Sequence, residues 1–290
     1  MKKIFLFFFI ILSPLLFSIK SFAIDKNIPK TEDEWSKAAN SLPWEDGPLV
    51  IDYDKANSSI DISNSFSVLR HEDAHQWLYW VNGTSFDYID YYAITDDSSQ
   101  YMFFYTDSGY VKTDDWTDVD PKKFLEQIKE NYKASNETRK QNGNPYILNV
   151  SWKKKPFLDG IYNSVYYALN VDWSDLTSSV EGTAIILGRE GYTTAKYVGG
   201  DQGYNENLLL NLSKIHKFNP TKEYKDWKAG DKVAAAGIGA LLATTLGVKY
   251  LKTGIFAVAA VFLKKLWFII FLPFIWLFNL FTRSSKKKKN

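Results

Sequence analysis

Two histidines four residues apart are the residues of this sequence best suited to chemistry. The segment His71-Glu72-Asp73-Ala74-His75 matches the H-E-x-x-H pattern, in which two imidazoles on one helix face bind a zinc ion. In this interpretation His71 and His75 are the metal ligands, and Glu72 is the general base for the metal-bound water. The pattern therefore raises the hypothesis of a zinc peptidase.

A zinc site of this kind needs a third ligand, which the sequence does not supply. The segment resembles the start of the zinc aminopeptidase signature, whose third ligand is a Glu from a following helix. No Glu occurs between His75 and Glu126, and His216 is the only other histidine. Glu72 also lies nearly opposite the apolar stripe of its helix, which consists of Ala74, Trp77, Leu78 and Val81. An amphipathic helix is the simpler interpretation, so we expect no metal or catalytic residues, with zinc as the alternative.

The elements that position these residues alternate between strands and helices. Apolar residues at helical spacing predict a helix over 70–81 and another over 208–215, and Asp120 with Pro121 marks the start of a third. Aromatic-rich or alternating runs predict strands at 49–53, 59–62, 88–95, 101–106, 146–152, 161–171, 183–189 and 192–198. Short connections predict an α+β fold, with an antiparallel sheet and helices on one of its faces.

Both ends of the chain are apolar and predict export and anchoring. Residues 1–23 open with two lysines, Lys2 and Lys3, which are followed by an apolar run and the small residues of a cleavage site, as in a signal peptide. Residues 266–281 form an uncharged apolar run, and the basic cluster after it marks the cytoplasmic side of a membrane. We therefore expect a bacterial inner-membrane protein with its main domain in the periplasm and a cytoplasmic tail. The predicted parts are a signal peptide at 1–23, an exported domain at 24–229, a membrane-associated helix at 230–252, a transmembrane anchor at 253–282 and a basic tail at 283–290.

The membrane-associated part is rich in small residues. Residues 231–250 read as one Ala/Gly-rich helix, on which small side chains share a face at steps of four, three and four. Such a face lets helices approach closely in lipid, which predicts self-association or a membrane partner. The residues of this face are Ala236, Ala240, Ala243 and Gly247. The sequence leaves open whether this helix spans the membrane.

The charge of the exported domain excludes one class of partner. Residues 1–23 hold 3 basic residues, and residues 230–290 hold 10 basic and 1 acidic. Subtracting these from totals of 35 basic and 33 acidic leaves 22 and 32 in residues 24–229, a net charge of −10. A domain this acidic repels nucleic acid. The chain has no cysteine, so its stability must come from its core, to which 17% aromatic residues contribute.

Several spaced fragments together resemble one family. They are Gly109-Tyr110-Val111-Lys112, Asn136 with Arg139, Val150-Ser151-Trp152, Leu187-Gly188-Arg189-Glu190-Gly191-Tyr192, and Gly230-Asp231-Lys232-Val233-Ala234-Ala235-Ala236-Gly237. In order and spacing, this resembles the bacterial DUF2167 family of uncharacterised membrane-anchored proteins. The resemblance implies an exported domain and a small-residue membrane helix in a Gram-negative inner membrane, and it implies no known reaction. The family usually has no histidines at positions 71 and 75, so the resemblance gives no support to a catalytic pair there.

Three residues of the matching fragments could form a binding site. Arg189 lies beside a predicted strand end, and Asn136 and Arg139 lie near a predicted helix end, so together they could line an anion or peptide site. Three functions follow from the sequence. The leading hypothesis is a non-enzymatic, membrane-anchored protein that binds or scaffolds an envelope protein partner. The alternatives are a membrane-tethered zinc peptidase and an envelope sensor of a small ligand or peptide.

Overall fold

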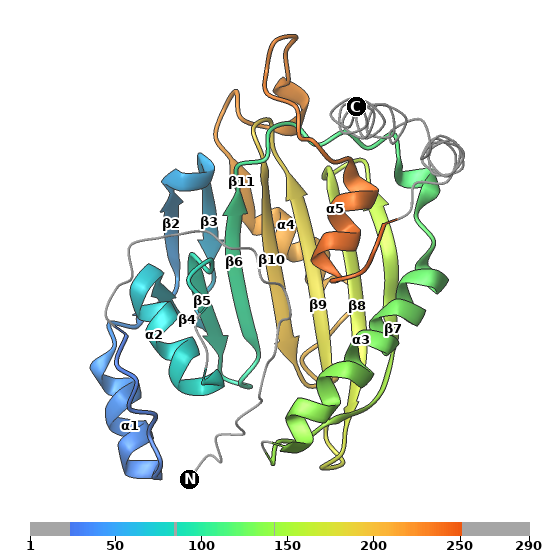
Figure 1. Cartoon of the computed structure of the whole chain (residues 1–290). Coiled ribbons are helices and arrows are strands. Elements are labelled where there is room, and N and C mark those ends of the chain that lie inside the picture. The colour runs from blue at the N-terminus through green and yellow to red at the C-terminus, as the bar shows by residue number, and fades with distance from the viewer. Residues whose placement is uncertain (1–23, 84–85, 142, 251–290) are drawn as a thin grey trace, which may run out of the picture. The chain divides into compact units, whose positions relative to one another are not determined.

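A computed structural model describes residues 24–83, 86–141 and 143–250 (Figure 1). The predicted signal peptide at 1–23 and the predicted anchor and tail at 253–290 lie outside these residues. Within the described ranges, no helix has both the length and the apolar character that crossing a membrane requires.

Eight antiparallel strands form the main sheet. Their bounds are β1 (Glu45–Asp46), β4 (Phe66–Arg70), β5 (Tyr91–Thr95), β6 (Gln100–Thr106), β7 (Ile147–Asp159), β8 (Ser164–Trp173), β9 (Ser178–Leu187) and β10 (Tyr192–Gly199). The order across the sheet is β1-β4-β5-β6-β10-β9-β8-β7. Strands β7 to β10 are consecutive neighbours, and β10 then pairs with β6, with Tyr192 opposite Thr106. A central seam therefore joins two halves of the sheet that are far apart in sequence.

A second, smaller sheet packs on one face of the main sheet. It consists of β2 (Leu49–Tyr53), β3 (Ser58–Ile62) and β11 (His216–Phe218), in the order β11-β3-β2. Helix α4 (Leu208–Ile215) covers the same face, behind the main sheet in Figure 1. Together they enclose a large apolar core that includes Ile51, Ile60, Tyr197 and Leu209.

The other face of the main sheet carries the remaining α-helices of the described residues. Helices α1 (Glu32–Ser41) and α2 (His71–Asn82) pack over β4, β5 and β6, in a cluster with Trp77 and Met102. Helix α3 (Pro121–Gln141) packs over β7 and β8 through Ile128, together with Leu246, which follows α5 (Ile238–Thr245). In Figure 1, α3 and α5 lie in front of the sheet. Short 3-10 helices occur at Asp54–Ala56, Trp116–Asp118 and Tyr224–Asp226.

The α+β class and the large antiparallel sheet are confirmed. Strand β2 and helix α4 have the predicted bounds, and Asp120 caps α3 by accepting hydrogen bonds from the backbone N–H groups of Lys122 and Lys123. The prediction that helices cover one face only was wrong. Helix α4 lies on the opposite face, because its apolar side, with Leu209 and Leu212, packs into the core below the small sheet.

The Ala/Gly-rich helix predicted for 231–250 is shorter than expected. Helix α5 has eight residues, because the segment before it pairs with another part of the backbone: Tyr110 bridges to Val233, and the N–H of Ile238 donates to the carbonyl of Lys112. Ala236 therefore precedes the helix, and Gly247 follows it with a positive φ of 68°. Ala240 and Ala243 remain helical, and Ala243 is buried against the rest of the domain. Self-association through these residues stays a prediction.

Candidate functional site

The two histidines of the H-E-x-x-H segment do not form a metal site with other described residues. His71 is the first residue of α2 and has a positive φ of 43°, and its ring packs against Tyr91 with the centroids 5.3 Å apart. His75 uses its Nε2 to donate to the carbonyl oxygen of Ile89, at 2.7 Å. In the described ranges, no group of three His, Asp or Glu side chains is placed to hold a metal ion. Among the described residues, the structure therefore supplies no third ligand for the zinc alternative.

His216, the remaining histidine, is part of the core. Its Nε2 lies 3.0 Å from Ser58 Oγ and 2.9 Å from Thr193 Oγ1, and its side chain is almost fully buried. The Nδ1 atom has no hydrogen-bond partner among the described residues. Burial lowers the pKa of His216 to about 3, so the neutral imidazole is the form that the fold accommodates.

Asn136, Arg139 and Arg189 do not share one site. The Asn136 side chain donates to the carbonyl of Ile147 and accepts from its N–H, which ties α3 to β7. Arg189, just beyond the carboxyl end of β9, donates from Nε and Nη2 to the carboxylate of Asp231, at 2.7 and 2.8 Å. These hydrogen bonds lower the pKa of Asp231 to about 2. Arg139 lines a cavity that contains neither Asn136 nor Arg189 in its lining.

Replacing Arg189 with alanine is expected to lower the melting temperature of the protein. The change removes a bidentate ion pair whose side chains are only 16% and 20% exposed, and it leaves the Asp231 carboxylate without its cation. Lys37→Ala is the control, because the pair of Lys37 with Asp33 is about three-quarters exposed and contributes little. Thermal unfolding followed by circular dichroism measures both variants, and equal melting temperatures would contradict a stabilising role for Arg189.

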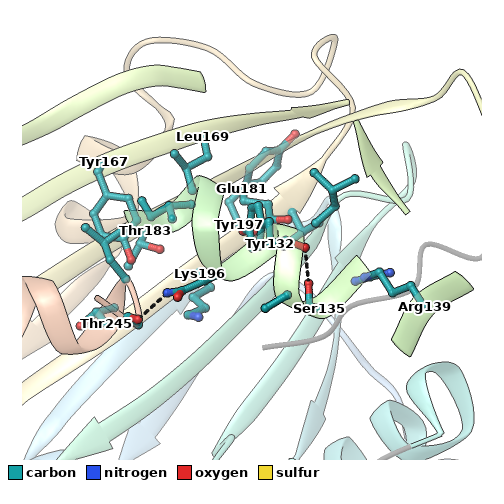
Figure 2. A pocket seen from close by; sticks show the side chains of 18 of the residues that line it. Tyr132, Ser135, Arg139, Tyr167, Leu169, Glu181, Thr183, Lys196, Tyr197 and Thr245 are labelled. Atoms are coloured by element: carbon teal, nitrogen blue, oxygen red, sulfur yellow. Dashed lines mark hydrogen bonds between the residues drawn. The ribbon is translucent and has the colours of Figure 1, made fainter. Parts of the chain in front are cut away.

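A cavity of about 560 Å³ lies between α3, strands β8 to β10 and the residues that follow α5 (Figure 2). Its lining is mostly apolar and aromatic, with a small number of charged and hydroxyl groups. The lining includes Ile128, Tyr132, Ser135, Arg139, Tyr167, Leu169, Glu181 and Lys196. Both the volume and the lining are typical of sites for small molecules.

Two opposite charges lie side by side on the floor of the cavity. Lys196 of β10 pairs in register with Thr183 of β9, and Glu181 lies two residues from Thr183 on the same face. Glu181 and Lys196 are therefore diagonal neighbours, a relation that places Cβ atoms about 7 Å apart. Neither side chain makes a hydrogen bond or an ion pair within 4.0 Å in the described part of the chain. Burial raises the pKa of Glu181 and lowers that of Lys196.

Arg139 adds a second positive charge at the cavity. Its side chain is 2% exposed, and its guanidinium carbon lies 4.8 Å from the centre of the Trp173 ring. Nη1 donates to the carbonyl of Pro145 at 3.2 Å, whereas the buried Nε has no hydrogen-bond partner among the described residues. Glu181 interacts electrostatically with both Lys196 and Arg139, and Figure 2 shows all three residues in the lining of the cavity. The cavity thus contains one carboxylate and two cations.

Glu181 and Lys196 were not among the residues predicted to form a site, although the sequence around each of them indicates one. Each is the one charged residue within an otherwise apolar or hydroxyl stretch, Val180-Glu181-Gly182-Thr183-Ala184 and Thr194-Ala195-Lys196-Tyr197-Val198. A charge in the middle of a central strand is costly unless it faces a partner or a cavity. Two such charges in consecutive strands therefore indicate a polar site.

One wall of the cavity comes from the last described part of the chain. Asn131 of α3 donates from Nδ2 to the carbonyl of Gly247 at 2.8 Å, and Gln127 exchanges hydrogen bonds with the backbone of Lys249. At the start of α5, Asp115 accepts from the N–H of Gly239 at 3.1 Å. These contacts hold residues 238–249 against α3 and the preceding loop.

Comparisons with known proteins identify a family and a similarity to a solved structure. The family described as "Protein of unknown function (DUF2167)" matches residues 45–275, and no curated protein matches the chain. The solution structure of cyanobacterial PsbP (CyanoP) from Synechocystis sp. PCC 6803 is similar at 12% identity and a TM-score of 0.34. This similarity covers 59% of this chain and 92% of that chain, and it is too low to support an argument about function. Because the family match spans most of the sequence, including every residue that lines the cavity, the chain belongs to the DUF2167 family.

Proposed function

We propose that this protein is a binding protein of the bacterial cell envelope, which holds a small ligand in the cavity between α3 and the main sheet. The observation that carries this proposal is the position of Glu181 and Lys196. They are opposite charges on neighbouring strands, yet they face a cavity and form no ion pair with each other.

Recessed charges without partners are unfavourable in a folded domain. A charged group removed from bulk water needs hydrogen bonds or an opposite charge to compensate the lost hydration. Among the described residues, Glu181 and Lys196 have no hydrogen bond and no ion pair within 4.0 Å, and the Nε atom of Arg139 has no hydrogen-bond partner. A ligand that supplies these partners would bind with both favourable contacts and little reorganisation of the site.

A place in the envelope is supported by the sequence. The signal-like residues 1–23 and the apolar run at 266–281 with its basic tail are the features that support export and anchoring. A binding role without catalysis is common to the leading hypothesis from the sequence and to the alternative of an envelope sensor. The cavity supports the alternative, because its volume suits a small ligand or peptide.

The proposal predicts that small molecules stabilise the full-length protein through the cavity. The thermal unfolding of the detergent-solubilised chain is measured with amino acids, dipeptides, monosaccharides, nucleotides and dicarboxylates at millimolar concentration. At least one class is expected to raise the melting temperature, because ligands of the folded state stabilise it by mass action. Ser135→Trp should abolish this shift by filling the cavity, whereas Glu137→Trp, on the exposed side of α3, should retain it.

Two results would contradict the proposal. One is that no class of compound changes the melting temperature of the wild-type protein. The other is that the stabilising compounds act equally on the Ser135→Trp variant, which would place their binding outside the cavity.

A further inference from the structure

The arrangement of charges in the cavity also defines the class of ligand. We infer, on the basis of the proposed function, that the ligand is a zwitterion: an amino acid or short peptide with a free ammonium group and a free carboxylate. Glu181 binds the ammonium group, and Lys196 and Arg139 bind the carboxylate.

Singly charged and neutral ligands leave part of this site unmatched. A simple anion would pair with Lys196 and Arg139 but would be repelled by Glu181, which interacts electrostatically with both of them. A simple cation would meet the opposite problem, and a neutral sugar would form no charge-assisted hydrogen bond with any of the three groups. A ligand with both charges can pair with Glu181 and with the cations at the same time.

Arg139 has the form of a carboxylate-binding group. A guanidinium presents a planar fork of N–H donors that matches the two oxygens of a carboxylate. Trp173 and the carbonyl of Pro145 hold the Arg139 side chain, and its buried Nε is still without a partner in the described ranges. A donor that is buried, held in position and unpaired is an independent indication that a ligand acceptor binds at this end of the cavity.

The rest of the lining suits the body of a short peptide. Tyr132 and Tyr167 offer aromatic rings to an ammonium group or to an apolar side chain, and Ile128 and Leu169 add aliphatic surface. Burial raises the pKa of both tyrosines, so they remain neutral and add no further negative charge. The specificity for charge therefore rests on Glu181, Lys196 and Arg139.

The test compares free and blocked forms of the same compounds on the full-length protein in detergent. Calorimetry measures the affinity for amino acids and apolar dipeptides, for their N-acetyl derivatives and for their C-terminal amides. We expect at least one free zwitterion to bind, and we expect blocking either end to weaken binding by about tenfold or more, as the loss of a charge-assisted hydrogen bond does. This comparison uses the wild-type protein and does not depend on the folding of any variant.

Two variants assign the ends of the ligand. Glu181→Gln should weaken binding of the free peptide about tenfold while leaving the weaker binding of the N-acetyl form unchanged. Lys196→Met should weaken binding of the free peptide about tenfold and leave the weaker binding of the C-terminal amide unchanged. Glu137→Gln and Lys133→Met, both on the exposed side of α3, are the matched controls and should bind as the wild type does.

The outcomes separate this inference from the proposed function. One outcome is that neutral or singly charged compounds bind, that Ser135→Trp abolishes their binding, and that zwitterions do not bind. In that case the inferred ligand class is wrong, and the proposed binding function stands. Equal affinities for free and blocked peptides would also overturn the inference. If no compound of any class binds, the proposed function fails with it.

Discussion

Replacing Gly191 with alanine is expected to lower the free energy of unfolding by about 3 kcal/mol, as overpacking of a tight site does. A Cβ at this position would lie 2.2 Å from the carbonyl oxygen of Thr106 and 2.6 Å from the Tyr105 hydroxyl. The carbonyl belongs to the backbone at the end of β6, so it cannot rotate away as a side chain would. The seam between β6 and β10 would have to open locally to make room.

Gly160→Ala is the matched control for this prediction. Gly160 lies in the turn between β7 and β8, and a Cβ there would meet no atom within 4 Å. Its substitution should change stability by less than about 0.5 kcal/mol. Urea unfolding of the two variants and the wild type measures the difference. Equal stability of the two variants would show that the close approach at Gly191 costs nothing.

Acidification from pH 7 to pH 5 is expected to destabilise the protein by about 2 kcal/mol through His216. The pKa of this buried histidine is about 3 in the folded protein, against an ordinary value of 6.5. Below pH 6.5 the unfolded chain therefore binds a proton that the folded chain does not. The free energy of unfolding is therefore not reduced by His216 above pH 6.5. It falls progressively as the pH drops below 6.5, and the loss stops growing near pH 3, where the folded protein also binds the proton.

Variants identify His216 as the origin of this loss. His216→Gln keeps a polar group near Ser58 and Thr193 but cannot become charged, so its stability should fall about 2 kcal/mol less than that of the wild type between pH 7 and pH 5. His71→Gln, at the exposed start of α2, should behave as the wild type does. Chemical unfolding at both pH values gives the comparison. An unchanged pH dependence in His216→Gln would show that the core accepts the charged imidazole.

Local patterns predicted local structure well. The alternation in 49–53 and the apolar spacing in 208–215 gave the bounds of β2 and α4, because both segments have one face in the core. Strand β4 (Phe66–Arg70) was not predicted, because its residues lead directly into a helix. They form a strand through tertiary pairing with β1 and β5, which the local sequence does not reveal. The small second sheet likewise depends on β11, in which His216 pairs with Ile60 of β3, 156 residues earlier in the chain.

The candidate site could not be predicted from any single segment of the sequence, because its residues come together only in the fold. Glu181 and Lys196 become neighbours through the register of β9 and β10, and Arg139 reaches them from a helix that precedes both strands. Arg189, which the sequence grouped with Arg139, is bound instead by Asp231, 42 residues later. The H-E-x-x-H letters match a zinc pattern, but the positive φ at His71 and the hydrogen bond of His75 are set by contacts with residues 89–91.

The seam between β6 and β10 has a consequence for the order in which the protein can fold. Strand β6 is complete at Thr106, but Tyr192, its first partner on β10, is synthesised 86 residues later. If the chain emerges from a translocation pore with its N-terminus first, β6 is exposed for as long as those 86 residues take to follow it. During this time the inner edge of β6, a strand that includes Tyr101 and Phe103, has no partner strand. An unpaired edge of this kind favours association with other chains. The nascent chain therefore passes through a period in which a chaperone that covers extended aromatic segments would raise the yield of folded protein.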